Sequence, residues 1–163
     1  MIKSIAFIVV ASTASISLIS QAHADPKLTM KLNGKEWTAL PSTVFGATGI
    51  AGLPATSVTI SGDSDEKKTH GLTILLNTFK GPGEYTCEAK TEQAQFMVQY
   101  HDGLATNPFQ ARHIVTNNKS GEKFVMNITK ASGTDIEGTF SGTVTTDDGT
   151  KVLKITDGVF DTE

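Results

Sequence analysis

The residues of this sequence best suited to chemistry are histidines and the carboxylate that follows one of them. Asp102 directly follows His101, and His70 and His113 lie to either side in the chain. Imidazole nitrogens and carboxylate oxygens bind zinc or transfer protons as general acids and bases. The spacings match neither a His-Glu-x-x-His motif nor a Cys/His zinc pattern. We therefore expect no metal site and no cofactor, and a metal-dependent enzyme using His101, Asp102 and His113 is kept as the second alternative.

Other motifs that support catalysis or ion binding are incomplete. A serine hydrolase of the nucleophile-elbow type needs Gly-x-Ser-x-Gly, whereas Ser141 directly precedes the last glycine of residues 138–142. The acidic runs at 63–66 and 147–148 lack the spacing of a calcium loop, so we interpret them as hairpin tips. Cys87 is the single cysteine, and we expect its thiol to be buried. The sequence predicts no catalytic residue and indicates that the protein is not an enzyme.

Aromatic residues give the best indication of a binding surface. Rings on a β-sheet provide contact area for sugars and for proteins, although most rings of this chain are expected in the core. Tyr100 and Phe109 flank a loop that contains Gly, Asn and Pro. Loops on a rigid β scaffold commonly carry recognition residues. We therefore predict Tyr100 and Phe109 as binding residues.

The elements that position these side chains are nearly all β-strands. Polar and apolar residues alternate with a period of two in most segments, as in 27–32 and 124–129. Asn33-Gly34 predicts a tight hairpin after the first strand. Residues 41–54 show no sustained period and are interpreted as a long connection that can include a short strand, and 88–95 as a loop or short helix. About nine strands joined by short turns predict an all-β fold, an antiparallel β-sandwich, with a partly closed barrel as the alternative.

The N-terminus has the composition of an export signal. Lys3 precedes an apolar run from Ile5 to Ile19, and an Ala-x-Ala site ends at Ala24. We predict a signal peptide at 1–24, cleavage after Ala24, and a single domain at 25–163. The run is shorter than the ~20 residues of a spanning helix, so no stable membrane anchor is expected after cleavage. The predicted location is the periplasm or the extracellular space, and the oligomeric state is left open.

Several turn and strand residues also resemble a known family. Residues 136–144 (IEGTFSGTV), 147–151 (DDGTK) and 155–160 (ITDGVF) resemble the ending of a family of small exported β-domains of unknown function, the DUF6252-like proteins. Residues 30–37 (MKLNGKEW) and 81–85 (GPGEY) are similar to its opening and its central strand entry. The resemblance implies an exported β-domain and no catalytic residue. This chain lacks the lipid-attachment cysteine that many members carry.

These observations favour a non-enzymatic binding module for a protein or an envelope glycan. The formal net charge of −3 gives no basic surface for nucleic acid, which such recognition ordinarily requires. The first alternative is a structural or assembly subunit in which the strand at 27–32 pairs with a neighbouring molecule by strand addition.

Overall fold

The computed structural model describes residues 24–49, 56–87, 96–103, 112–116, 124–145 and 152–163. Of residues 87, 96, 102, 112–116, 144 and 145 it describes the backbone alone. The predicted signal peptide, apart from its last residue, and the segment 88–95 lie outside this part of the chain. No helix within the described ranges is long and apolar enough to cross a membrane.

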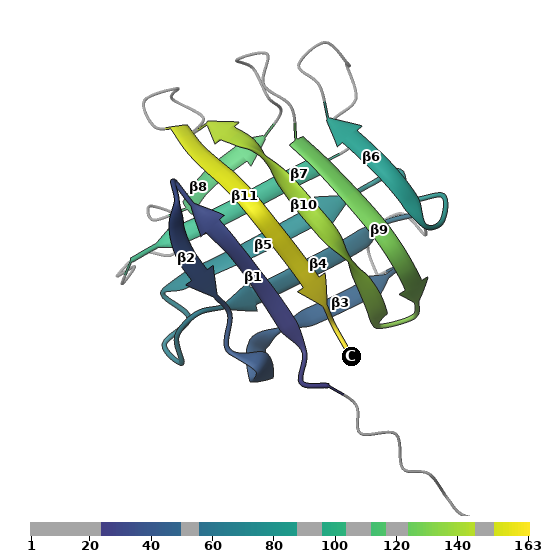
Figure 1. Ribbon diagram of the computed structural model, residues 1–163, viewed down its shortest axis with the longest axis horizontal. Helices are drawn as coiled ribbons and strands as arrows, with labels where there is room; N and C mark the ends of the chain where they lie inside the picture. Colours follow the sequence, from purple (N-terminus) through teal and green to yellow (C-terminus); the bar gives the residue numbers. More distant parts are fainter. Residues whose placement is uncertain (1–23, 50–55, 88–95, 104–111, 117–123, 146–151) are drawn as a thin grey trace, which may run out of the picture.

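Two antiparallel sheets make up the molecule, and the strands of one run across those of the other (Figure 1). The six-stranded sheet has the order β2 (Lys35–Thr38), β1 (Lys27–Leu32), β11 (Val152–Asp161), β10 (Asp135–Thr145), β9 (Phe124–Ser132) and β6 (Gly83–Cys87). The five-stranded sheet has the order β3 (Phe45–Thr48), β4 (Val58–Asp63), β5 (His70–Leu76), β7 (Phe96–Asp102) and β8 (Arg112–Thr116). The predicted antiparallel β-sandwich is therefore confirmed.

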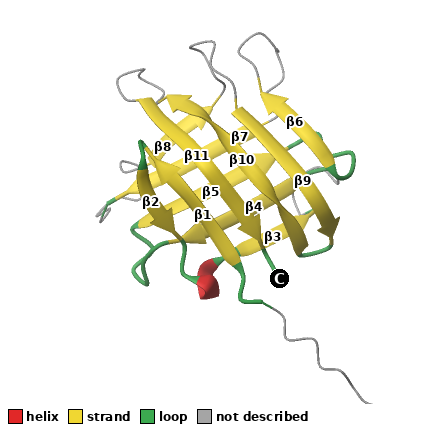
Figure 2. Cartoon of the chain, in the orientation of Figure 1, coloured by secondary structure: helices red, strands yellow, loops and turns green. Residues whose placement is uncertain are grey.

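The strand number is higher than the predicted nine or so, and one reason lies in residues 41–54. The long connection expected here contains the short helix η1 (Pro41–Thr43) and, in agreement with the short strand allowed for, the strand β3 (Figure 2). Gly46 of β3 lies against the side chain of Thr162. A glycine at such a point interrupts the apolar alternation, because it packs through its backbone rather than through a side chain.

The first hairpin forms as its turn residues require. Asn33 and Gly34 both have positive φ values, 49° and 82°, as a two-residue turn of type I′ needs at both central positions. The turn pairs β1 with β2, and Leu32 lies opposite Lys35. Leu28, Met30 and Trp37 are buried, so the alternation of the sequence correctly gives the inner face.

The strands β9, β10 and β11 form the meander that the sequence indicates, built around paired phenylalanines and glycines. Gly138 lies opposite Phe160, and Phe140 lies opposite Gly158. Each glycine accommodates the ring of its partner, because a Cβ on Gly158 would come within 2.7 Å of the Phe140 ring and one on Gly138 within 2.5 Å of the Phe160 ring. The rings of Phe124, Phe140 and Phe160 follow one another at centroid distances of 6.2 Å.

A single hydrophobic core lies between the sheets. It contains fully buried residues of both, such as Met126 and Ile128 of the six-stranded sheet and Ile60 and Ile74 of the other. Hydrogen bonds join the sheets at two corners: the amide of Leu40 donates to the carbonyl of Asp63 at 2.8 Å, and that of Thr48 to Gly133 at 3.1 Å. The shared core and the hydrogen bonds at the two corners fix the position of one sheet relative to the other.

Candidate functional site

Two of the histidines lie at one end of the five-stranded sheet, in a cluster with two aspartates. We call Asp63, Asp65, His70 and His101 the tip cluster. The Nε2 of His101 lies 3.1 Å from the carbonyl oxygen of Lys68 and 3.4 Å from Oδ1 of Asp63. Both side chains lie over Gly71, where a Cβ would meet them. These contacts tie β7 to the hairpin between β4 and β5, which is a structural role.

Asp65 organises that hairpin. Its carboxylate accepts hydrogen bonds from the backbone amides of Thr69 (3.1 Å) and His70 (2.9 Å) and from the Thr69 hydroxyl (2.9 Å). Burial acts to raise the pKa of this carboxyl, but the hydrogen bonds from Thr69 and His70 outweigh it and lower the pKa to about 2. The acidic run at 63–66 thus belongs to a hairpin tip, as predicted.

The residues of the enzyme alternative lie on the neighbouring strands β7 and β8, and the side chains of Asp102 and His113 are not described. His113 of β8 lies opposite Tyr100, whereas His101 lies opposite Arg112. Asp102 lies opposite His70. Among the side chains that the structure describes, no three of His, Cys, Asp or Glu are placed to hold a metal ion. The tip cluster therefore gives no support to a metal-dependent enzyme.

The structure describes only one of the two predicted binding residues. Tyr100 is only 8 % exposed and lies edge-on to Trp37, with ring centroids 6.5 Å apart. Its ring thus belongs to the core and is not displayed on a surface, because β7 turns this position inward. Phe109 lies outside the described residues. Cys87 lies on β6, and its predicted burial stays a prediction because its side chain is not described.

The strand proposed for strand addition is not at an edge. β1 pairs with β2 on one side and with β11 on the other. Strand addition requires unpaired backbone groups along a free edge, and β1 lacks such an edge over its paired residues. The assembly hypothesis loses the strand on which it was based.

The outer face of the six-stranded sheet carries a hollow of about 470 Å³ over β9, β10 and β11. Its lining includes the polar side chains of Asn127, Thr139, Ser141, Thr156 and Asp157, and the valines Val125 and Val159. We call it the outer hollow. Neighbouring strands align its members, since Thr139 lies opposite both Asn127 and Val159. The hollow thus combines a larger area of apolar surface with the hydroxyl, amide and carboxylate groups of these polar residues.

A β-bulge in β11 shapes one side of the outer hollow. Leu28 and Leu32, four positions apart, pair with Phe160 and Ile155, five positions apart. Gly138 and Gly142 oppose the same two residues of β11, so β11 contains one extra residue relative to both neighbours. Asp157 lies at the bulge with a φ of 54°. Bulges redirect side chains and are frequent beside functional sites.

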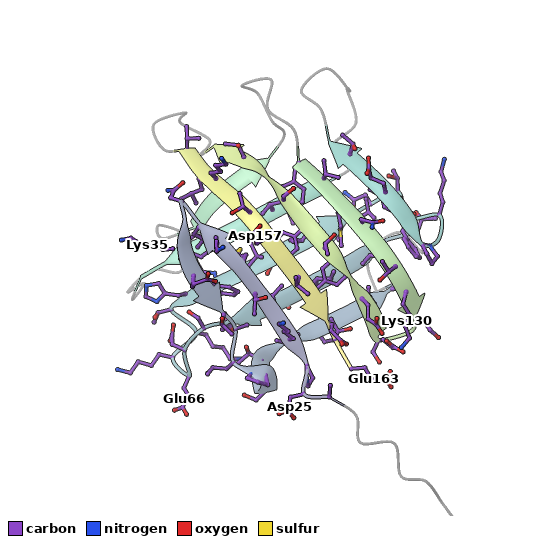
Figure 3. The ribbon with its side chains drawn as sticks, in the orientation of Figure 1. Asp25, Lys35, Glu66, Lys130, Asp157 and Glu163 are labelled. Atoms are coloured by element: carbon purple, nitrogen blue, oxygen red, sulfur yellow. The ribbon has the colours of Figure 1, made fainter. Side chains whose placement is uncertain are left out.

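The carboxylate of Asp157 is exposed beside a lysine. Figure 3 shows Asp157 on the face of the sheet that is turned toward the viewer. Its Oδ2 lies 2.8 Å from Nζ of Lys31, and Glu36 lies 3.7 Å from the same nitrogen. The hydrogen bond and the charge of Asp157 raise the pKa of Lys31 above its ordinary value. Two carboxylates, those of Asp157 and Glu36, thus lie beside the single positive charge of Lys31, and the three groups together carry one formal negative charge.

Sequence reasoning missed this site, although a signal was present. Ile155 and Phe160 are both buried, yet they lie at positions of opposite parity in one strand. Strict alternation cannot bury both, and Asp157-Gly158 between them is a pair that tolerates unusual backbone angles. A break in the period of two inside a strand therefore indicated the bulge.

The fold and the hollow define the molecule as an antiparallel β-sandwich with an open hollow, lined by apolar surface and by polar groups, on one outer face. Comparisons with protein-family models, with curated proteins and with solved structures find no match to this chain. The resemblance to exported β-domains stays a prediction, and the functional inference depends on the outer hollow.

Proposed function

We propose that this protein is an exported, non-enzymatic binding module that recognises a protein or a glycan of the cell envelope through the outer hollow. The observation that carries the proposal is the bulge at Asp157, which places an exposed carboxylate beside a concave set of hydroxyl and amide groups. A left-handed backbone at a residue other than glycine is unfavourable and is often found at functional positions.

The location is proposed from the N-terminal sequence. A cleaved signal peptide at 1–24 gives a protein in the periplasm or outside the cell, where envelope polymers are the abundant partners. The outer hollow is open and lies on rigid strands rather than on a loop, which fixes its side chains relative to one another.

A steric block tests the proposal without assuming the ligand. Thr139→Tyr places a ring in the outer hollow, and Thr38→Tyr places the same ring on β2, outside the hollow. Both threonines are exposed strand residues of the same sheet, so both variants are expected to fold. We expect the purified protein to cosediment with an isolated envelope fraction, Thr139→Tyr to lose this retention, and Thr38→Tyr to keep it. Equal retention of the two variants, or none for the unmodified protein, contradicts the proposal.

A further inference from the structure

We infer that the ligand of the outer hollow is a glycan, that is, a neutral, hydroxyl-rich saccharide chain of the envelope rather than a protein. The inference rests on the proposed function and names the ligand class of the same site. Two observations support it: which side chains line the hollow, and which of their hydrogen-bonding groups are left without a partner in the described part of the protein.

The polar groups of the hollow are available to a ligand. Asn127, Thr139 and Ser141 are exposed, and in the part of the chain that the structure describes their side chains make no hydrogen bond to protein. A hydroxyl donates one hydrogen bond and accepts others, and an amide does both. Sugar hydroxyls have the same double capacity, so each contact can form in either direction.

The arrangement of these groups follows the sheet. Asn127 and Thr139 lie side by side on neighbouring strands, and Ser141 lies two residues further along β10, opposite Val125. Strands are about 4.8 Å apart and alternate residues about 6.6 Å apart along a strand. Hydrogen-bonding groups at such spacings can contact several hydroxyls of an extended chain lying across the hollow, while Val125 and Val159 contact its C–H groups.

The carboxylate of Asp157 also suits a ligand whose hydroxyl groups can donate to it. Lys31 holds one oxygen of Asp157, and a carboxylate has a second oxygen that can accept hydrogen bonds. Hydrogen bonds to a charged acceptor are stronger than neutral ones. A carboxylate that accepts hydrogen bonds from sugar hydroxyls therefore forms these stronger hydrogen bonds with an uncharged ligand.

The lining is unlike the centre of a protein–protein interface. Such centres are enriched in Trp, Tyr, Met and Arg, and none of these four residue types lines the outer hollow. Phe140, the one aromatic residue of the lining, is buried in the core at 3 % exposure. Val125 and Val159 are the apolar residues of the lining outside the core, and neither offers the large ring of a protein-interface anchor.

Chemical treatment of the envelope fraction separates the two partner classes. Periodate cleaves the vicinal diols of saccharides, and borohydride then reduces the aldehydes so that no covalent capture occurs; protease digestion removes protein. We expect retention of the purified protein to be lost after periodate and kept after protease. Retention that is lost after protease and kept after periodate overturns the glycan inference and leaves the proposed function standing. Absence of retention on the untreated fraction overturns both.

Variants that remove hydrogen-bonding groups without blocking the hollow complete the test. Soluble saccharide released from the same fraction is the probe, and its competition with retention measures affinity. Thr139→Val is expected to weaken binding about fivefold, the effect of one hydrogen bond, and Asp157→Gly about tenfold or more, since a charged acceptor is lost. Glycine suits the positive φ at this position, so the bulge is preserved. Thr38→Val is the matched control, and an equal loss in this control contradicts the inference.

Discussion

At the scale of single residues, two aspartates differ in the contacts that their carboxylates make. Asp65 directs its carboxylate into its own hairpin, where it accepts hydrogen bonds from Thr69 and His70. Asp157 lies at a bulge, and its side chain is 66 % exposed beside Lys31. A carboxylate that is satisfied by its own backbone organises a turn, whereas one presented on an open face is free to contact a ligand.

Asp65 makes the stability of the hairpin depend on acid. Its pKa is lowered to about 2, below that of an unfolded chain, so its stabilising contribution is present above about pH 4 and is lost as the pH falls through about 2. We expect Asp65→Asn to be less stable than the unmodified protein at pH 6, with the difference shrinking between about pH 4 and pH 2. Chemical denaturation at a series of pH values measures this.

The control for this prediction is Glu66→Gln, which changes an exposed carboxyl at the same hairpin tip (Figure 3). A stability difference for Asp65→Asn that stays constant from pH 6 to pH 2 contradicts the assignment, because the carboxylate form is then not what stabilises the turn.

At the scale of elements, the meander of β9, β10 and β11 depends on its glycines. Gly138 and Gly158 accept phenylalanine rings from the neighbouring strand. The register shifts beside Gly138 and between Phe140 and Gly142 reflect one extra residue in β9 and one in β11 relative to β10. The same strands carry the outer hollow, so the inner packing of rings on glycines positions the outer polar groups.

Gly138→Ala is expected to destabilise the fold by about 2 kcal/mol or more, because the added methyl overlaps the Asn127 carbonyl and the Phe160 ring. Gly103→Ala is the matched control: nothing lies within 4 Å of a Cβ there, and its φ is outside the left-handed region. Thermal unfolding measures both. Equal Tm values for the two variants disprove the proposed packing role.

At the scale of the whole molecule, one core joins both sheets. Trp37 of the six-stranded sheet contacts Tyr100 of the other, and this tryptophan is the only one in the chain. Its fluorescence therefore reports on the contact between the sheets, while circular dichroism reports on the strands themselves. A protein with one shared core is expected to unfold in a single cooperative transition.

Truncations on the two sides of the core test this cooperativity. Ile74→Ala and Ile128→Ala remove buried atoms from different sheets, and each is expected to destabilise the protein by about 2–5 kcal/mol. Fluorescence and circular dichroism should show the same lowered midpoint in both variants. Val152→Ala, at a side chain 52 % exposed, is the control with little effect. Separate transitions for the two sheets contradict a single core.

The sequence by itself determined the strand pattern and the sandwich. Alternation with a period of two marks two faces of a strand, and Asn33-Gly34 has the backbone freedom that its turn requires. These are local properties, set by neighbouring residues, so the first hairpin and the final meander were correctly predicted.

Only the tertiary structure decided which faces are covered and which residues meet. Periodicity does not give strand order, so the place of β1 between β2 and β11 and the burial of Tyr100 were not predicted. The outer hollow combines β9, β10 and the bulge of β11, and its residues become neighbours through strand pairing alone. The extra residue at Asp157 reverses the alternation of inward and outward side chains along β11. As a result Ile155 and Phe160, which are five positions apart, both pack into the one core.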